Sequence, residues 1–289
     1  MALPAEVRRT PSADRRRVSP LLPVLAVVAA IATIGPASAA PATECTGAGL
    51  CYCVNTDFRD AVAAKVDAFR KTIAAERAKG KAIGYMSVPL STTGGSFFNV
   101  NRDVAQKVKE RVEARYGTNA VWVLDPTARE ADLPAQNGVR AGQGDYLVMW
   151  TRIIEGPRAL GEDFDFVYFV GPSDFAAYFA LTGKDDMERI TAYFDERVAR
   201  DDDLKRAVER GTVTKASFRN YYALRASVAF SAGAHDEWNV VRALNQRRRD
   251  DKAFGMGNQL PVMFDGRAVS TAEYDQPAAV GNAGACKAN

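Results

Sequence analysis

The chain has 289 residues and a single histidine, His235. A Ser–His–Asp hydrolase needs a histidine base well downstream of its serine. Ala229-Phe-Ser-Ala-Gly233 resembles a nucleophile turn, but His235 follows Ser231 by only four residues. Zinc sites built from two or three histidines are excluded as well. This scarcity of histidine leaves carboxylates as the main candidates for acid, base or nucleophilic chemistry.

Two common phosphate-binding patterns are also missing. Neither GxxxxGK[ST] nor GxGxxG occurs, so we do not expect the loops that cradle phosphates in most nucleotide-binding domains. The Gly94-Gly95 pair would let backbone amides approach an anion, although a simple turn explains the same pair. We predict a protein without a cofactor and without a metal.

An excess of basic charge is absent once the first 39 residues are set aside. These residues hold five arginines against Glu6 and Asp14, a balance of 5 − 2 = +3, and the whole chain is also +3. Residues 40–289 are therefore formally neutral. A neutral chain has no sequence-wide basic surface for nucleic acid, so we expect no nucleic-acid partner.

The first 39 residues are typical of a secretory signal. The arginines precede the apolar stretch Leu21–Gly35, and Ala37-Ser-Ala39 offers small residues for cleavage. The apolar stretch is too short to span a bilayer comfortably, and no later stretch is long enough. We expect residues 1–39 to be a signal peptide, giving an exported, periplasmic or secreted protein without a membrane contact. A retained anchor and a twin-arginine route are the alternatives.

Cysteine is confined to the two ends of the remaining chain. The four cysteines allow two disulfides in an oxidising compartment, with three pairings. A Cys51–Cys53 bridge is disfavoured because its small ring strains the geometry. We expect one local loop from Cys45 and one bridge that joins the N-terminal segment to Cys286.

Hydrophobic periodicity predicts alternating strands and helices in residues 57–269. Short apolar segments bounded by Gly, Pro or Asp are typical of buried strands, and apolar residues three or four apart are typical of helices. We expect strands at 82–90, 120–124, 164–170 and 259–264, with helices at 57–79, 101–116, 146–155, 174–181, 186–200, 205–222 and 236–249.

This order predicts an α/β fold. A strand, a helix and a strand within about forty residues form a βαβ unit, which implies parallel pairing. We expect one domain over 57–269, a flavodoxin- or Rossmann-like open, mostly parallel sheet of about five strands with helices on both faces and a helical insertion at about 175–222. Residues 40–56 form a cysteine-bearing segment and 270–289 an irregular tail. The fifth strand would end at Phe230.

Open α/β sheets bind ligands at the carboxyl ends of their strands. Segments that follow the predicted strands therefore supply the candidate substrate-binding residues. These are Ser91, Gly94, Gly171, His235 and Asp236. Asp174, after the third strand, is a further candidate for proton transfer or sugar binding.

Glu237 is the candidate catalytic carboxylate. It lies near the predicted start of a helix, where the positive end of the helix dipole favours an ionised carboxylate. An ionised carboxylate can act as a nucleophile or stabilise a developing cation. The alternative is that Asp236 and Glu237 only cap the helix.

Several short segments resemble the nucleoside 2-deoxyribosyltransferase-like family. Tyr85-Met-Ser-Val-Pro-Leu90 is similar to its opening strand, and Gly233-Ala-His-Asp-Glu237 has the spacing of its Gly-Thr-x-x-Glu segment. Val121–Pro126, Val170–Pro172 and Gln259–Val262 match later pieces. The chain departs at Val170 and Ala234, and by the sixty residues between Gly171 and Gly233.

The resemblance implies cleavage or transfer of an N-glycosidic bond in a nucleoside- or nucleotide-like small molecule. In that reading Glu237 attacks the sugar carbon and Tyr85 positions its carboxylate. The alternative is an exported binding or structural protein without catalysis, because no complete catalytic set is evident and the aromatic-rich segments 164–179 and 221–222 would suit a pocket or an interface.

Overall fold

The structure is a computed structural model that describes residues 40–90, 93–224, 231–251, 258–278 and 284–287. The predicted signal peptide, Ser91 and the segment that ends at Phe230 lie outside the described residues. Within them, no helix is long and apolar enough to cross a membrane.

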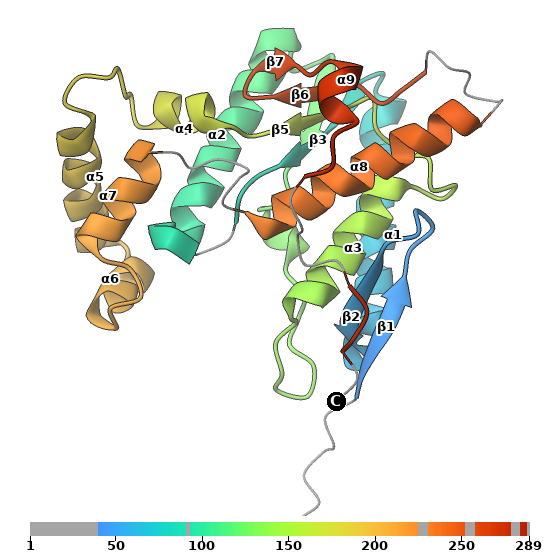
Figure 1. Ribbon diagram of the computed structural model, residues 1–289, viewed down its shortest axis with the longest axis horizontal. Helices are drawn as coiled ribbons and strands as arrows, with labels where there is room; N and C mark the ends of the chain where they lie inside the picture. Colours follow the sequence, from blue (N-terminus) through green and yellow to red (C-terminus); the bar gives the residue numbers. More distant parts are fainter. Residues whose placement is uncertain (1–39, 91–92, 225–230, 252–257, 279–283, 288–289) are drawn as a thin grey trace, which may run out of the picture. The chain divides into compact units, whose positions relative to one another are not determined.

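A five-stranded sheet forms the centre of the fold, in the order β4-β3-β5-β6-β7 (Figure 1). Four neighbouring strands are parallel, and the short β7 runs antiparallel to β6. The strands are β3 (Ala82–Ser87), β4 (Val121–Leu124), β5 (Phe166–Phe169), β6 (Val262–Phe264) and β7 (Arg267–Ala268). The predicted α/β class, with a mostly parallel sheet of about five strands, is confirmed.

The fifth strand of the sheet, β7, follows a tight turn at Asp265-Gly266. Asp265 and Gly266 both have positive φ, 53° and 82°. Two such residues in succession allow a tight hairpin, and Asp-Gly is a preferred pair for it. The chain therefore reverses after β6 and adds β7 to the sheet.

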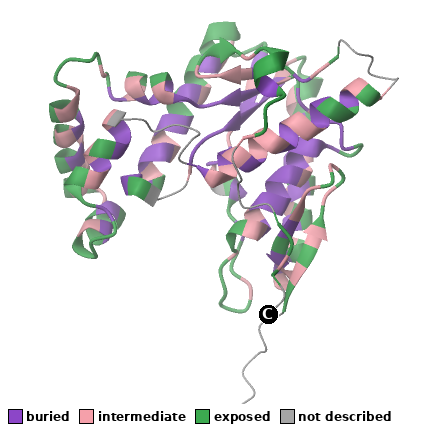
Figure 2. Cartoon of the chain, viewed as in Figure 1, coloured by how far each residue is buried: buried purple, intermediate pink, exposed green. Residues whose placement is uncertain are grey.

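Helices cover both faces of the sheet, which is buried between them (Figure 2). One face packs against α1 (Arg59–Ala78), α3 (Gln143–Glu155) and α8 (Ala232–Asp250), and we call this side the α3/α8 face. The other packs against α2 (Phe98–Tyr116) and α4 (Pro172–Tyr178), and we call it the α2/α4 face. Because side chains alternate along a strand, Tyr85 enters the α3/α8 core and Met86 the α2/α4 core.

Three more helices follow α4 and extend the α2/α4 core. They are α5 (Asp186–Arg200), α6 (Asp202–Glu209) and α7 (Lys215–Leu224). Aromatic rings join α5 to α7, with Phe194 5.0 Å from Phe218 between ring centroids. The buried Tyr222 hydroxyl donates to Asn101 Oδ1 at 2.7 Å and accepts from the Phe97 N–H at 3.0 Å. These bonds connect α7 to the start of α2.

The N-terminal cysteine segment is a β-hairpin of β1 (Pro41–Cys45) and β2 (Cys51–Asn55). Disulfides join Cys45 to Cys51 and Cys53 to Cys286, which is one of the arrangements left open above. The hairpin packs on α3, where Tyr52 and Thr151 share a 2.8 Å hydrogen bond between hydroxyls. The C-terminal tail is not wholly irregular, because Ser270 caps the short helix α9 (Thr271–Tyr274).

Candidate functional site

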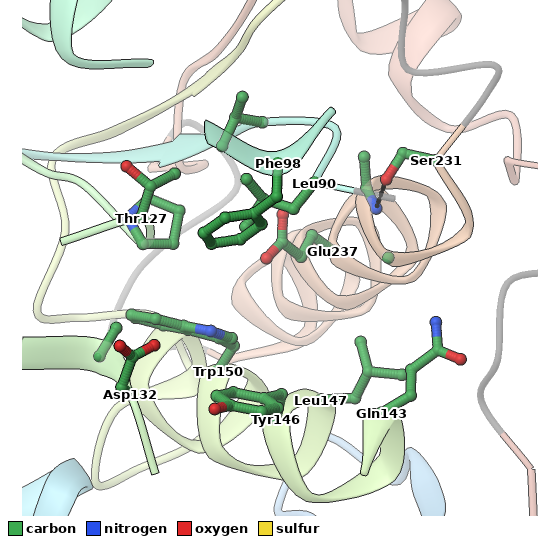
Figure 3. A pocket seen from close by; sticks show the side chains of 15 residues that line it. Leu90, Phe98, Thr127, Asp132, Gln143, Tyr146, Leu147, Trp150, Ser231 and Glu237 are labelled. Atoms are coloured by element: carbon green, nitrogen blue, oxygen red, sulfur yellow. Dashed lines mark hydrogen bonds between the residues drawn. The ribbon is translucent and has the colours of Figure 1, made fainter. Parts of the chain in front are cut away.

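A cavity of about 580 Å³ opens at the carboxyl ends of β3 and β4, between α3 and α8 (Figure 3). This is the edge of the sheet where open α/β folds bind ligands. Its lining is mostly apolar, with few polar groups, as is usual for small-molecule sites. The lining residues are Val88, Leu90, Phe98, Pro126, Thr127, Ala131, Asp132, Gln143, Tyr146, Leu147, Trp150, Ser231, Gly233, Ala234 and Glu237.

Helix α8 carries Glu237 into this cavity. The helix begins at Ala232, four residues before the predicted start at Asp236, because the Ser231 side chain caps it by accepting the Ala234 N–H at 3.2 Å. Glu237 consequently lies in the second turn of the helix. The effect of the helix dipole falls off beyond the first turn. The helix N-terminus therefore stabilises the ionised Glu237 carboxylate only weakly, which corrects the prediction.

Tyr85 of β3 holds the Glu237 carboxylate. Its hydroxyl donates to Glu237 Oε1 at 2.5 Å, across 152 positions in the chain. Tyr85 is fully buried, and burial raises the pKa of its phenol well above the ordinary value, so the hydroxyl remains protonated and able to donate. The ring is itself fixed by an edge contact with Phe164, at 5.7 Å between centroids.

Burial raises the pKa of Glu237 to about 7. The Ser87 hydroxyl and the bond from Tyr85 act in the opposite direction, and the charge of Asp236 adds to the rise. Ser87 lies close enough to stabilise the charge but falls short of hydrogen-bond geometry. No ion pair to Glu237 occurs among the described residues. At neutral pH, ionised and protonated forms therefore coexist, as suits a catalytic carboxyl group.

Aromatic rings form two sides of the cavity. Figure 3 shows the Glu237 carboxylate directed into the space between Phe98, at the start of α2, and Trp150 and Tyr146 of α3. Phe98 is one of the few large apolar side chains that remain exposed, at 37 %. These rings were not among the predicted site residues, although the spacing of Tyr146, Leu147 and Trp150 along one helical face was a usable signal.

Asp174 lies apart from Glu237 and Tyr85, which corrects the predicted grouping of the three. It accepts from the Tyr168 hydroxyl at 2.9 Å and from the Gly171 N–H at 2.9 Å, and it pairs with Arg111. Tyr168 belongs to the α2/α4 core. Asp174, Tyr168 and Arg111 border a separate surface pocket, and none of them is in the lining of the cavity that holds Glu237.

The four predicted substrate-binding residues that the structure describes are likewise not in the lining. Gly94 lies near Tyr221, and Gly171 packs so tightly on Asp265 that an added Cβ would meet the Asp265 Cβ at 2.4 Å. Asp236 is buried and His235 half-buried on α8, and neither lines the cavity. The cavity lies at the carboxyl ends of the strands, the edge where a site was predicted, and of the predicted site residues that the structure describes, only Glu237 is in its lining.

Among the described residues, no cluster of three or more His, Cys, Asp or Glu side chains is arranged to hold a metal ion. Comparison with known proteins gives no family to guide the interpretation: no family model, no curated protein and no solved structure matches the chain. The chemistry of the site must be argued from Glu237, its tyrosine partner and the aromatic cavity.

Proposed function

We propose that this protein cleaves or transfers the N-glycosidic bond of a nucleoside-like substrate, with Glu237 as the nucleophile. The observation that supports the proposal best is the 2.5 Å Tyr85–Glu237 hydrogen bond at the wall of an aromatic cavity. The family resemblance gave positioning and attack to these same two residues. Without it, the geometry alone would favour carboxylate chemistry on a planar ligand.

The reaction would proceed in two displacements. A Glu237 oxygen attacks the anomeric carbon while the C–N bond breaks, and the electron pair of that bond stays on the base nitrogen. A neutral base takes up a proton from solvent as it leaves. Water, or the N–H group of a second base, then attacks the anomeric carbon of the glycosyl ester, gives up a proton to solvent and releases the Glu237 carboxylate. Tyr85 holds the carboxylate in line throughout.

The aromatic rings suit the base of such a substrate. A planar heterocycle between Phe98 and Trp150 would place its sugar near Glu237, since Figure 3 shows the carboxylate between these rings. Aromatic rings in offset contact contribute about 0.5–1.5 kcal/mol beyond the area they bury. This contribution provides affinity without base-specific hydrogen bonds.

Two disulfides are compatible with an extracellular or periplasmic protein. We propose further that residues 1–39 direct export and are removed. Mass spectrometry of the protein recovered from a cell envelope or culture medium tests this step, and a mature chain that still begins at Met1 would contradict it.

The enzymatic proposal is tested by release of free base from a panel of nucleosides and nucleotides. Wild-type protein should release base, whereas Glu237→Gln and Glu237→Ala proteins should stay folded and inactive. Intact-mass spectrometry with 2-fluoro-2-deoxy nucleosides should detect a glycosyl adduct in the wild type alone. Base release that is unchanged in both variants would rule the proposal out.

A binding protein without catalysis is the second candidate, favoured by the predominantly apolar lining and by the neutral form that Glu237 retains near pH 7. A thermal-shift screen separates the two functions, because any ligand that binds only the native state raises the melting temperature. Stabilisation by nucleosides without release of base would favour this candidate.

A further inference from the structure

The cavity carries charge of one sign. Of the residues that the structure describes around it, Glu237 and Asp132 are acidic and none is Lys, Arg or His. Asp236 is buried beside Glu237 on α8, and its negative charge raises the pKa of Glu237. A ligand phosphate would meet only like charge here, whereas a cation would be attracted.

Asp132 is the acidic group most available to a ligand. It follows the short 3-10 turn Arg129–Ala131, and its side chain is exposed at the rim of the cavity. Figure 3 places its carboxylate beside the Trp150 ring, on the far side of the cavity from Ser231. None of the basic residues whose side chains the structure describes forms an ion pair with it. Its charge therefore acts mainly on what enters the cavity.

The aromatic rings add to the same preference. The faces of Trp, Tyr and Phe attract a cation within about 6 Å, by about 0.5–2 kcal/mol depending on how far it is desolvated. Phe98, Tyr146 and Trp150 all contribute to the lining. A heterocycle that is both planar and positively charged would use the rings and the carboxylates together.

We propose that the cavity selects glycosides whose leaving group is a positively charged heterocycle, such as a pyridinium riboside, and that Asp132 determines this selection. The inference rests on the function proposed above. When the C–N bond of such a substrate breaks, its electron pair neutralises the ring nitrogen, and the base leaves uncharged. The base needs no proton donor in order to leave, which fits a cavity whose charged side chains are carboxylates.

The test compares ligands of matched shape and different charge. Glu237→Gln protein, which cannot turn over, is titrated by calorimetry at pH 8 with nicotinamide riboside, its neutral 1,4-dihydro form and nicotinamide mononucleotide. The cationic riboside should bind about five- to tenfold more tightly than the dihydro form. The mononucleotide, with its phosphate, should bind more weakly than the riboside.

The Asp132→Asn substitution in the same background should reduce the preference for the cation to about twofold. Asp60→Asn is the matched control, because Asp60 is an exposed carboxylate on α1 outside the lining, and it should leave the preference intact. Equal affinity for the charged and neutral ribosides, no binding of either, or a preference that survives Asp132→Asn would overturn the inference.

Turnover by the wild type separates this inference from the proposed function. If the charge preference holds and no base is released from any riboside, the glycosidic reaction is refuted while the selection stands. If neutral and cationic substrates bind equally and both are cleaved, the reaction stands and the selection is refuted.

Discussion

Two tyrosine–carboxylate pairs lie on opposite faces of one sheet, and they differ in what else surrounds the carboxylate. On the α3/α8 face, Glu237 accepts from Tyr85, opens to a large cavity and has no cation beside it among the described residues. On the α2/α4 face, Asp174 accepts from Tyr168 and the Gly171 N–H and pairs with Arg111. The tyrosine–carboxylate pair thus has a cation beside it on one face of the sheet, and on the other face it borders an open cavity.

The difference follows from neighbouring structure rather than from the pairs themselves. Burial is the largest influence on both carboxyl groups and raises the pKa of each. Arg111 and the Gly171 N–H offset part of that effect for Asp174. Buried polar groups with all their partners stabilise a fold, whereas a carboxyl group short of partners is a candidate for chemistry.

The largest expected effect concerns turnover. If the comparison is correct, Glu237→Gln should lower base release on the order of a thousandfold or more, because it removes the nucleophile. Asp174→Asn, which keeps the acceptor for Gly171 and Tyr168, should leave release within about threefold. Steady-state rates with the best substrate of the panel measure both. A comparable loss in a folded Asp174→Asn protein would break the comparison.

The Glu237→Gln protein should be more stable than the wild type, although it is less active. Because burial raises the pKa of Glu237 to about 7, from an ordinary value of 4.5, its ionised form opposes folding. This cost is absent below about pH 4.5, grows as pH rises and is complete above about pH 7. The free energy of unfolding of the Glu237→Gln protein should therefore be about 3 kcal/mol higher than that of the wild type at pH 8. Urea titrations under non-reducing conditions should show the difference vanish near pH 4.5; a constant difference would contradict the assigned pKa.

Arg111 tests the other half of the comparison. Arg111→Met leaves Asp174 buried without its cation, so the pKa of Asp174 should rise further and the fold should lose about 1–2 kcal/mol at pH 8, a value reduced by the exposure of Arg111. The loss should disappear at low pH, where Asp174 is protonated. Arg115 is an exposed arginine of α2 that borders the same small surface pocket as Arg111 and Asp174. Arg115→Met is therefore the control, and it should change the free energy of unfolding little. Equal losses in both proteins would mean that the ion pair contributes nothing.

The comparison also shows how far sequence predicts this molecule. The parallel strands were predictable, because short apolar segments such as 82–90 and 164–170 have few other uses. The hairpin β1–β2 was not, since β1 has no buried residue, β2 buries only Tyr52 and Val54, and disulfides hold the segment. The order of strands and helices predicted the edge of the sheet at which the cavity lies.

Which side chains meet at that edge was harder to predict. Asp174 and Glu237 both follow segments that end at this edge of the sheet. The face that Asp174 occupies depends on the alternation of side chains along β5, and the face that Glu237 occupies depends on the Ser231 cap of α8. Trp150 illustrates the same limit. The period of α3 shows that one face is apolar, but only the packed structure shows that part of this face borders a cavity instead of core.

The smallest effect distinguishes the two tyrosines. Tyr85→Phe removes a donor to the ionised carboxylate, so the pKa of Glu237 should rise above its value of about 7. A hydrogen bond to a charged group is worth about 1.5–3 kcal/mol, and partial compensation by Ser87 would leave a shift of about one pH unit. The rise of kcat/KM with pH should move upward by that amount, and the rate at high pH should stay below that of the wild type, because the hydroxyl that holds the carboxylate in line is lost. Tyr168→Phe, which acts on Asp174, should leave the profile in place.

A loss of rate at every pH without a shift would show that Tyr85 orients Glu237 rather than tuning its ionisation, whereas a shift in the Tyr168→Phe protein would mean that the two faces of the sheet are coupled.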